Sequence, residues 1–279
     1  MSRYPAIDVR GALVAVTGAG RGIGAATARA FVEAGAHVAL GDLDADAAAA
    51  TAAGLGPLAG AHPLDVTDKW SFAAFLAHAE SRHGRPLDIL VNNAGVMPNG
   101  PFLDQDEDLD RLTMEVNVFG LVHGMRLALP GMVERGRGHI VNVCSLAGKF
   151  PLAGLAMYNA SKYAAVGLTA ATRLEHADTG VSITAVLPSA VRTELSAGID
   201  YGVLPAVDPE DVAAAIVGTV ASRAAEVAVP GYLGPAADAA TLVPERVMRV
   251  LRRLAGDDAA ITRVDNAIRG AYVERIRRR

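Results

Sequence analysis

The feature that most restricts the fold of this chain is a short apolar run that ends in a glycine-rich turn. Residues 13–17, Leu-Val-Ala-Val-Thr, have the composition of a buried parallel strand. Four glycines follow within residues 17–24, and an alanine-rich stretch to about residue 34 then predicts a helix. A strand, a glycine turn and a helix in this order predict an α/β fold with a parallel sheet.

The turn is also a candidate ligand site. The first backbone N–H groups of a helix have no partner within the helix, and such an end attracts a pyrophosphate. A glycine-rich turn without function is the alternative, but the flanking strand and helix favour a dinucleotide site. The candidate cofactor residues here are Gly18, Gly20, Arg21, Gly22, Ile23 and Gly24.

A second strand, predicted over 36–41, ends at Asp42, which indicates the preferred cofactor. An acid at this position accepts hydrogen bonds from both adenosine ribose hydroxyls and repels a 2′-phosphate. Arg21 favours the opposite choice because its charge could pair with that phosphate, whereas Leu43 offers no positive charge. We therefore expect NAD, with NADP less favoured. The alternative interpretation makes Asp42 the N-cap of a helix over 45–53.

Two further strand ends supply cofactor candidates. Asp65, followed by Val66, ends the third predicted strand, and Thr67 or Asp68 is expected to cap the next helix. A fourth strand over 87–91 leads into Asn-Asn-Ala-Gly, which can hold a ligand or simply form a turn. The candidates in this second motif are Asn93, Ala94 and Gly95.

The chemistry is predicted around Tyr158 and Lys162, which are four residues apart and would share one face of a helix. An ammonium group beside a phenol lowers its pKa from about 10, which makes an acid/base for neutral pH. Alone, such a pair is more often a surface feature. Ser145 follows a fifth strand over 139–144, and Asn117 lies within a predicted helix over 106–129.

Together these motifs resemble the short-chain dehydrogenase/reductase family, in its compact single-domain branch. Residues 17–24 match the family turn Thr-Gly-x-x-x-Gly-x-Gly, and residues 92–95 match its Asn-Asn-Ala-Gly element. The resemblance covers about residues 10 to 230 and implies a Rossmann-type doubly wound parallel sheet. The residues that match the catalytic tetrad are Asn117, Ser145, Tyr158 and Lys162.

The resemblance also implies roles. Tyr158 would take the proton of a substrate hydroxyl while a hydride leaves to the nicotinamide, and Lys162 would bind the nicotinamide ribose. Ser145 would donate to the substrate oxygen, and Asn117 would bend its helix and hold a water. The family Pro-Gly motif reads Pro-Ser here, with Ser189 in place of glycine. The cofactor residues implied in this segment are Pro188, Val191 and Thr193.

A substrate pocket is expected from residues 96–102, 146–157 and 191–207. Its apolar members favour a hydrophobic secondary alcohol or ketone that is steroid-, terpenoid- or lipid-like, although they could instead pack a lid. The expected activity is NAD-dependent interconversion of such an alcohol and its ketone. Alternatives are a catalytically silent NAD-binding sensor, an NADP-dependent ketone reductase and a sugar-nucleotide epimerase, for which 279 residues leave little room. The apolar residues are Met97, Phe102, Phe150, Leu152, Leu155, Leu195, Ile199 and Tyr201.

Composition limits the remaining possibilities. Cys144 is the only cysteine, so no intramolecular disulfide forms, and a cytoplasmic setting is expected. The sequence contains no stretch of 18 uninterrupted apolar residues, so we expect no membrane span. The seven histidines are scattered, so no metal site is expected. The net charge is −4, and we expect no nucleic-acid partner.

The C-terminal part differs from the rest in charge. From residue 242 onward ten arginines face five acids, a net +5 that leaves −9 for the body. We therefore expect a catalytic domain over 1–235 and a basic helical extension over 236–279. The extension shows two amphipathic patterns, which we expect to pack on a homodimer or homotetramer near the substrate entrance; a membrane surface is the alternative. The apolar positions are Val247, Val250, Leu251, Leu254, Ile261, Val264, Ile268 and Tyr272.

Overall fold

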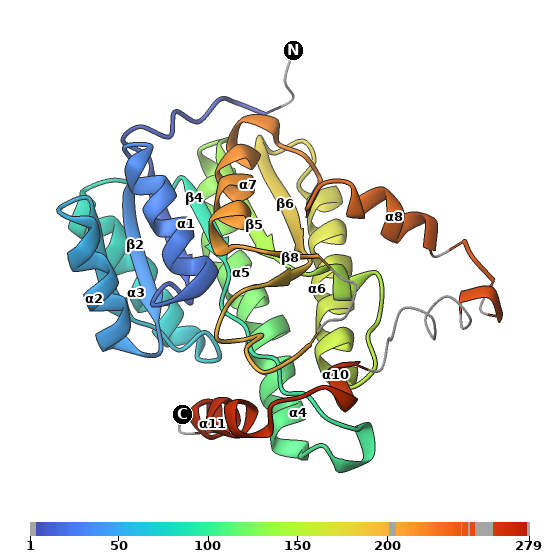
Figure 1. Ribbon diagram of the computed structural model, residues 1–279. Helices are drawn as coiled ribbons and strands as arrows, with labels where there is room; N and C mark the ends of the chain where they lie inside the picture. Colours follow the sequence, from blue (N-terminus) through green and yellow to red (C-terminus); the bar gives the residue numbers. More distant parts are fainter. Residues whose placement is uncertain (1–3, 201–204, 241, 245, 249–258, 278–279) are drawn as a thin grey trace.

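The computed structural model describes residues 4–277 except 201–204, 241, 245 and 249–258. Its centre is a seven-stranded parallel sheet in the order β3-β2-β1-β4-β5-β6-β9 (Figure 1). The chain passes outward from β1 to β3, then returns to start β4 on the other side of β1, which confirms the predicted doubly wound sheet. The strands are β1 Leu13–Thr17, β2 His37–Asp42, β3 Ala59–Pro63, β4 Ile89–Asn92, β5 Gly138–Val143, β6 Val181–Pro188 and β9 Glu226–Val229.

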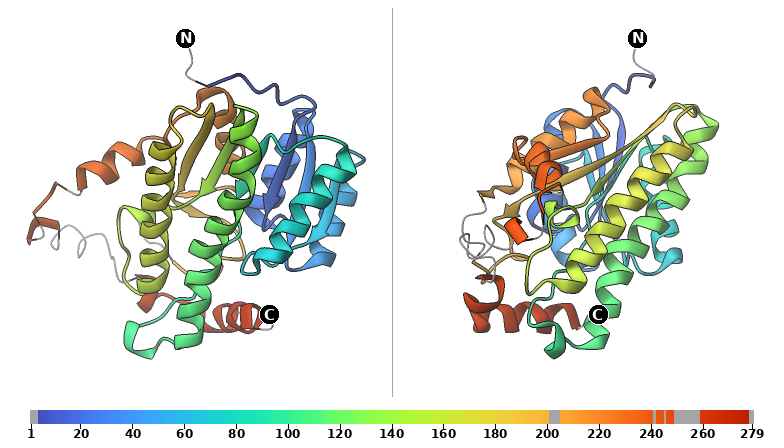
Figure 2. Two further views of the ribbon diagram at one scale, coloured as in Figure 1. Left: turned by 180° about the vertical axis from the view of Figure 1, so that it is seen from behind. Right: turned by 90° about the vertical axis from the view of Figure 1, so that its right-hand side faces the viewer.

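Helices cover both faces of the sheet (Figures 1 and 2). Side chains alternate across each strand, so Leu13 and Ala15 of β1 enter one core while Val14 and Val16 enter the other. One face carries α1 Gly22–Glu33, α2 Ala45–Leu55 and α7 Pro209–Ser222. The other carries α3 Lys69–His83, α4 Glu107–Met114, α5 Gly120–Glu134 and α6 Ala156–Glu175.

Two predicted boundaries are corrected by the structure. β3 ends at Pro63 rather than at Asp65, whose Oδ1 instead accepts hydrogen bonds from Thr67 N at 2.9 Å and Thr67 Oγ1 at 2.7 Å. The helix expected over 106–129 is not continuous, because a π-helical turn, η2 Glu115–Phe119, separates α4 from α5, and α5 extends to Glu134. Asp68 caps α3 through Trp70 N, as one of the two predicted caps.

By length and composition alone, the stretch Glu107–Glu134 could cross a membrane. Half of its most apolar window, 50%, is buried inside the protein, where α5 packs against β4, β5 and α3. A core helix of an α/β protein passes the same test, so the stretch is weak evidence for a membrane span.

The C-terminal part contains α8 Leu233–Ala240, α10 Ala259–Thr262 and α11 Asn266–Arg277. α8 runs across the boundary expected between residues 235 and 236. Most of the first predicted amphipathic stripe, including Val250, Leu251 and Leu254, lies outside the described residues. α11 lies beside α4, at the end of the molecule opposite the N-terminus (Figures 1 and 2).

The second predicted stripe is wrong in part. α11 buries Arg269, Tyr272 and Ile276, whereas Ile261 is 38% exposed and Ile268 is 46% exposed. An arginine therefore takes an inward position that the hydrophobic pattern assigned to isoleucine. The reason is that its guanidinium finds hydrogen-bond acceptors inside the protein, as described below.

Candidate active site

A cavity of about 670 Å³ lies beyond the carboxyl ends of β1, β2, β4, β5 and β6. This is the edge of an open α/β sheet at which ligands bind. The structure brings most of the predicted cofactor residues and three of the four catalytic candidates to its wall. The predicted residues that line it are Gly18, Arg21, Gly22, Ile23, Asp42, Leu43, Asp65, Val66, Asn93, Ala94, Gly95, Ser145, Tyr158, Lys162, Pro188, Val191 and Thr193.

Gly20 and Gly24 shape the glycine turn instead of lining the cavity. Gly20 N donates to Asp42 Oδ2 at 2.8 Å, which joins the turn to the end of β2. A Cβ on Gly24 would lie 2.1 Å from Gly18 O, so no larger residue fits there. Arg21 at the N-cap of α1 makes no side-chain capping bond, and the first N–H groups of this helix therefore keep the character of an anion site.

The amides that end β4 hold the glycine turn in place. Asn93 Nδ2 donates to Thr17 O at 2.9 Å and to Gly18 O at 3.0 Å. The N–H groups of Asn93 and Ala94 both donate to Thr17 Oγ1 at 3.0 Å. The Asn93 side chain thus positions the backbone around the cavity, in addition to lying on its wall.

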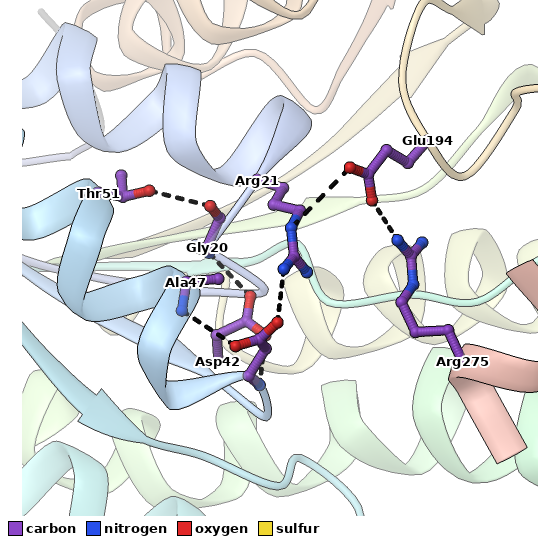
Figure 3. Close-up of polar contacts among 8 residues, drawn as sticks. Gly20, Arg21, Asp42, Ala47, Thr51, Glu194 and Arg275 are labelled. Atoms are coloured by element: carbon purple, nitrogen blue, oxygen red, sulfur yellow. Dashed lines mark hydrogen bonds and ion pairs between the residues drawn. The ribbon is translucent and has the colours of Figure 1, made fainter. Parts of the chain in front are cut away.

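Asp42 is not the cap of α2, so that alternative interpretation is wrong. The capping residue is Asp44, whose Oδ1 accepts from Ala47 N at 3.0 Å. Asp42 instead accepts from Gly20 N and, at 3.0 Å, from Asp44 N (Figure 3). Each carboxylate oxygen can accept more than one hydrogen bond, so Asp42 keeps capacity for a ligand at the cavity.

Arg21 is held by acids on two sides. Its Nη2 donates to Asp44 Oδ2 at 2.5 Å, and its Nε lies 3.9 Å from Glu194 Oε1 (Figure 3). The hydrogen bond to Asp44 is the main cause that raises the pKa of Arg21. Glu194 also pairs with Arg275 of α11, so a chain of alternating charges crosses from the β2 end to the C-terminal helix.

Tyr158 and Lys162 lie on α6 beside Ser145. Lys162 Nζ donates to Val143 O at 3.0 Å and lies 5.6 Å from the centroid of the Tyr158 ring. Desolvation in the pocket raises the pKa of Tyr158 to about 12, although a hydrogen bond with Ser145 acts in the opposite direction. The lowered phenol pKa expected beside Lys162 is not found, because desolvation of the phenolate outweighs the hydrogen bond with Ser145.

Asn117 is fully buried in the π-helical turn and does not line the cavity. Its Oδ1 accepts from Val96 N at 2.8 Å, while its Nδ2 donates to Val96 O and Ser161 Oγ, both at 2.9 Å. The residue therefore joins the loop after β4 to the helix that carries Tyr158. Its role in holding a water stays a prediction.

The substrate side of the cavity agrees with the sequence only in part. Phe102 is 64% exposed and does not line it, and Ile199 instead forms a bridge with Val264. Tyr201 lies outside the described residues. Ser189 Oγ donates to Pro205 O at 2.8 Å, so the serine in place of the family glycine ties down this loop. The expected residues that do line the cavity are Met97, Phe150, Leu152, Leu155 and Leu195.

The sequence placed the C-terminal extension near the substrate entrance but did not identify which residues of α8 and α11 line the cavity. The apolar stripe predicts an inward Tyr272 but not its place in the cavity, and the spacing of four residues to Ile276 is the signal that could have identified the second residue. The alanines of α8 carried no signal because small residues suit any packed helix. The residues missed are Leu233, Ala236, Ala237, Ala240, Tyr272, Arg275 and Ile276.

A model of the short chain dehydrogenase family matches residues 12–202, which include the glycine turn, Asn117, Ser145, Tyr158 and Lys162. The chain belongs to the short-chain dehydrogenase family. α8 and α11 lie outside the part of this family member that the model matches.

Relatives of this short-chain dehydrogenase include the probable oxidoreductase EphD of Mycobacterium tuberculosis, 40% identical over 205 residues. That alignment covers 72% of this chain but 34% of EphD, so the chain spans about a third of that protein's length. The sorbitol dehydrogenase of Cereibacter sphaeroides is 40% identical over 187 residues, which cover 66% of this chain and 72% of that enzyme.

A solved structure of a short chain dehydrogenase/reductase from Burkholderia phymatum, in complex with NAD, superposes with a TM-score of 0.76. It is 25% identical in sequence, and the alignment covers 83% of this chain and 93% of that one.

The close approach at Gly24 leads to a prediction on stability. Gly24→Ala should lower the free energy of unfolding by about 1–3 kcal/mol, because the new methyl group meets Gly18 O. Gly54→Ala in α2 is the matched control, since a Cβ there meets no atom within 4 Å. The control should gain roughly 0.5–1 kcal/mol from the removal of a helical glycine. Urea unfolding of both variants measures the difference, and equal stabilities would contradict the turn geometry.

Proposed function

We propose that the protein is an NAD-dependent oxidoreductase that interconverts a secondary alcohol and a ketone on a hydrophobic small molecule. The observation that carries the proposal is that one cavity contains both the glycine turn with Asp42 and the group Ser145, Tyr158 and Lys162. A dinucleotide site and a proton-transfer site are thus within reach of one another. A sensor that only binds NAD would have no need for the second group.

The residues present fit a dinucleotide. The uncapped N-terminus of α1 and the glycine turn suit a pyrophosphate, and Asp42 suits a ribose. Lys162 and Thr193, which line the same cavity, would hold the nicotinamide half. The Burkholderia phymatum relative holds NAD, which supports the same cofactor class here. When bound, the cofactor supplies a centre that accepts or gives a hydride.

The preference for NAD over NADP is inferred from the charges around Asp42. A 2′-phosphate beside Asp42 would face a carboxylate, and Leu43 next to it brings no compensating charge. Arg21 could compensate, but its guanidinium already contacts Asp44 and Glu194. A phosphate would have to compete with these two acids, which favours the cofactor without it.

Tyr158 is the proposed acid/base. With a pKa of about 12, its phenol holds a proton at neutral pH and can donate it to the oxygen of a ketone. Ser145 would stabilise the charge on the same oxygen by hydrogen bonding. In the direction of alcohol oxidation, Tyr158 must first lose its proton to solvent, and the positive charge that an oxidised nicotinamide would bring into the pocket would favour that loss.

The substrate class is inferred from the wall. Met97, Leu152, Leu155, Leu195 and Ile276 make it largely apolar near Tyr158. This composition favours a steroid-, terpenoid- or lipid-like alcohol over a highly charged compound.

We also infer a homodimer or homotetramer. Phe119 at the end of the π-helical turn η2 is 46% exposed, and Tyr163 and Leu174 of α6 are 44% and 73% exposed, so a second copy of the chain has apolar side chains to cover. Light scattering coupled to size exclusion should give a mass of two or four chains. A monomeric mass at micromolar concentration would rule out this inference.

Tyr158→Phe should fold normally, bind NADH as the parent does and lose nearly all turnover, since only the hydroxyl is removed. A loss of about 10²–10⁴-fold in kcat is expected for a group that transfers a proton. NADH absorbance with a panel of hydrophobic alcohols and ketones measures it, and NADH fluorescence serves as the binding control. Activity near the parent level would refute the acid/base assignment. A parent that binds NADH but turns over no member of the panel would favour the sensor.

Asp42→Ala should narrow the preference for NAD, because the carboxylate both binds the ribose and repels the phosphate. The ratio of kcat/KM for NAD⁺ to that for NADP⁺ should fall by about tenfold, or about 1.4 kcal/mol. Asp44→Ala provides a comparison, because it removes one of the two acids that hold Arg21 and leaves Asp42 in place. Equal kcat/KM for the two cofactors in the parent enzyme would contradict the assignment and make Arg21 the dominant residue.

A further inference from the structure

α11 forms part of the active-site wall although it lies far beyond the family-matched residues 12–202. Three residues of this helix, Tyr272, Arg275 and Ile276, line the cavity that contains Tyr158. Tyr272 is 6% exposed and Ile276 is 7% exposed. The two side chains are therefore buried in the cavity wall, while most of the other residues of α11 are exposed.

Arg269 fastens α11 to two loops of the cavity. The residue is 4% exposed. Its Nε donates to Asn99 Oδ1 at 2.6 Å and its Nη2 to Met97 O at 2.5 Å, both in the loop after β4. Its Nη1 donates to Leu195 O at 2.8 Å and to Ala197 O at 3.4 Å, in the loop after β7 Ala190–Val191. One guanidinium thus joins three segments that are distant in sequence.

Tyr272 is held from several sides. Met97 N donates to its Oη at 2.8 Å, and the Arg269 guanidinium carbon lies 4.4 Å from the ring centroid. The guanidinium carbon of Arg275 lies 5.5 Å from the same ring centroid, and the Arg275 side chain also pairs with Glu194. Tyr272 and Tyr158 line the same cavity, and Tyr272 also contributes to the raised pKa of the Tyr158 phenol, for which desolvation is the main cause. Tyr272 therefore lies on the wall of the cavity that contains Tyr158.

We propose that Tyr272 contacts the substrate and limits its size, and that Arg269 is the positioning residue that holds Tyr272 there. The proposal rests on the proposed dehydrogenase function, since it assigns residues to the substrate end of that site. The ligand class is a cyclic hydrophobic secondary alcohol or its ketone, packed against the ring of Tyr272 while its oxygen faces Tyr158 and Ser145.

The kinetic test compares a one-ring alcohol, cyclohexanol, with a two-ring alcohol, decahydro-2-naphthol. Tyr272→Ala should shift the ratio of kcat/KM toward the two-ring alcohol by about tenfold or more, since pocket volume discriminates by about 10–200-fold. Tyr272→Phe should keep the parent ratio because the ring remains. Glu274→Ala, on the exposed face of α11, is the matched control and should change nothing. The KM for NAD⁺ should stay within about twofold in all three variants.

Binding is measured separately from turnover, by saturation-transfer NMR of the same two alcohols with NADH-saturated protein. A parent that binds them without turnover would refute the proposed reaction for these compounds, while a changed binding preference in Tyr272→Ala would still support the role of Tyr272. An unchanged ratio in Tyr272→Ala, in both kinetics and binding, would overturn the assignment.

The positioning role of Arg269 is tested by Arg269→Met, which keeps the length of the side chain but removes its donors. Hydrogen–deuterium exchange should become faster in residues 266–277 and also in 96–99 and 193–198, and the alcohol preference should shift as in Tyr272→Ala. Arg269→Lys should not restore the parent behaviour, because one ammonium cannot span both loops as the planar fork does. Parent-like exchange in the two loops of Arg269→Met would overturn the positioning role.

Discussion

The contact between the glycine turn and the end of β4 is the constraint on which the rest of the site depends. β1 and β4 are neighbours at the point where the direction of strand order reverses, so the turn and the Asn-Asn-Ala-Gly element must approach closely. Asn93 binds the carbonyls of Thr17 and Gly18, and a Cβ on Gly18 would come within 2.8 Å of Ala94 Cα. Once these two loops are joined, α1 points its N-terminus at the cavity, and the loop after β4 is placed to receive Asn117 and α11.

Polar groups buried behind this contact set the chemistry of the site. Asn117 joins the loop after β4 to Ser161 of α6, one residue before Lys162. Lys162 is 5% exposed, and desolvation is the main cause that lowers its pKa. The phenol and the ammonium thus shift toward their neutral forms in the same pocket, since both lose water. A ligand that brings positive charge into the pocket would act directly on the phenol, because little solvent remains there to screen it.

Most of the sheet could be predicted from the sequence, as could most of the candidate cofactor residues that line the cavity, because strand periodicity and glycine turns are local signals. Asp42 can be identified for the same reason, because it ends a predicted strand. Tyr158 can be identified because Lys162 lies four residues further along the same predicted helix. Three features could not be predicted locally. Asp44 caps α2 although Asp42 has the same chemistry, the π-helical turn at Asn117 depends on contacts to Val96 and Ser161, and Arg269 is buried by carbonyls from residues about 70 and 170 positions away. For the cap of α2, two acids of the same chemistry compete. For the π-helical turn and for Arg269, the contacting residues are remote in sequence.

The attachment of α11 to the same chain has a consequence for how strongly its contacts must bind. A tethered segment meets its docking site at an effective concentration that for short connections is about millimolar. The ion pairs of Arg275 and Arg277 join partly exposed groups, and such pairs contribute only about 0–1 kcal/mol each. As a separate peptide the helix would need far tighter contacts to remain in the cavity wall. As part of the chain it can remain at the cavity wall without contacts of that strength.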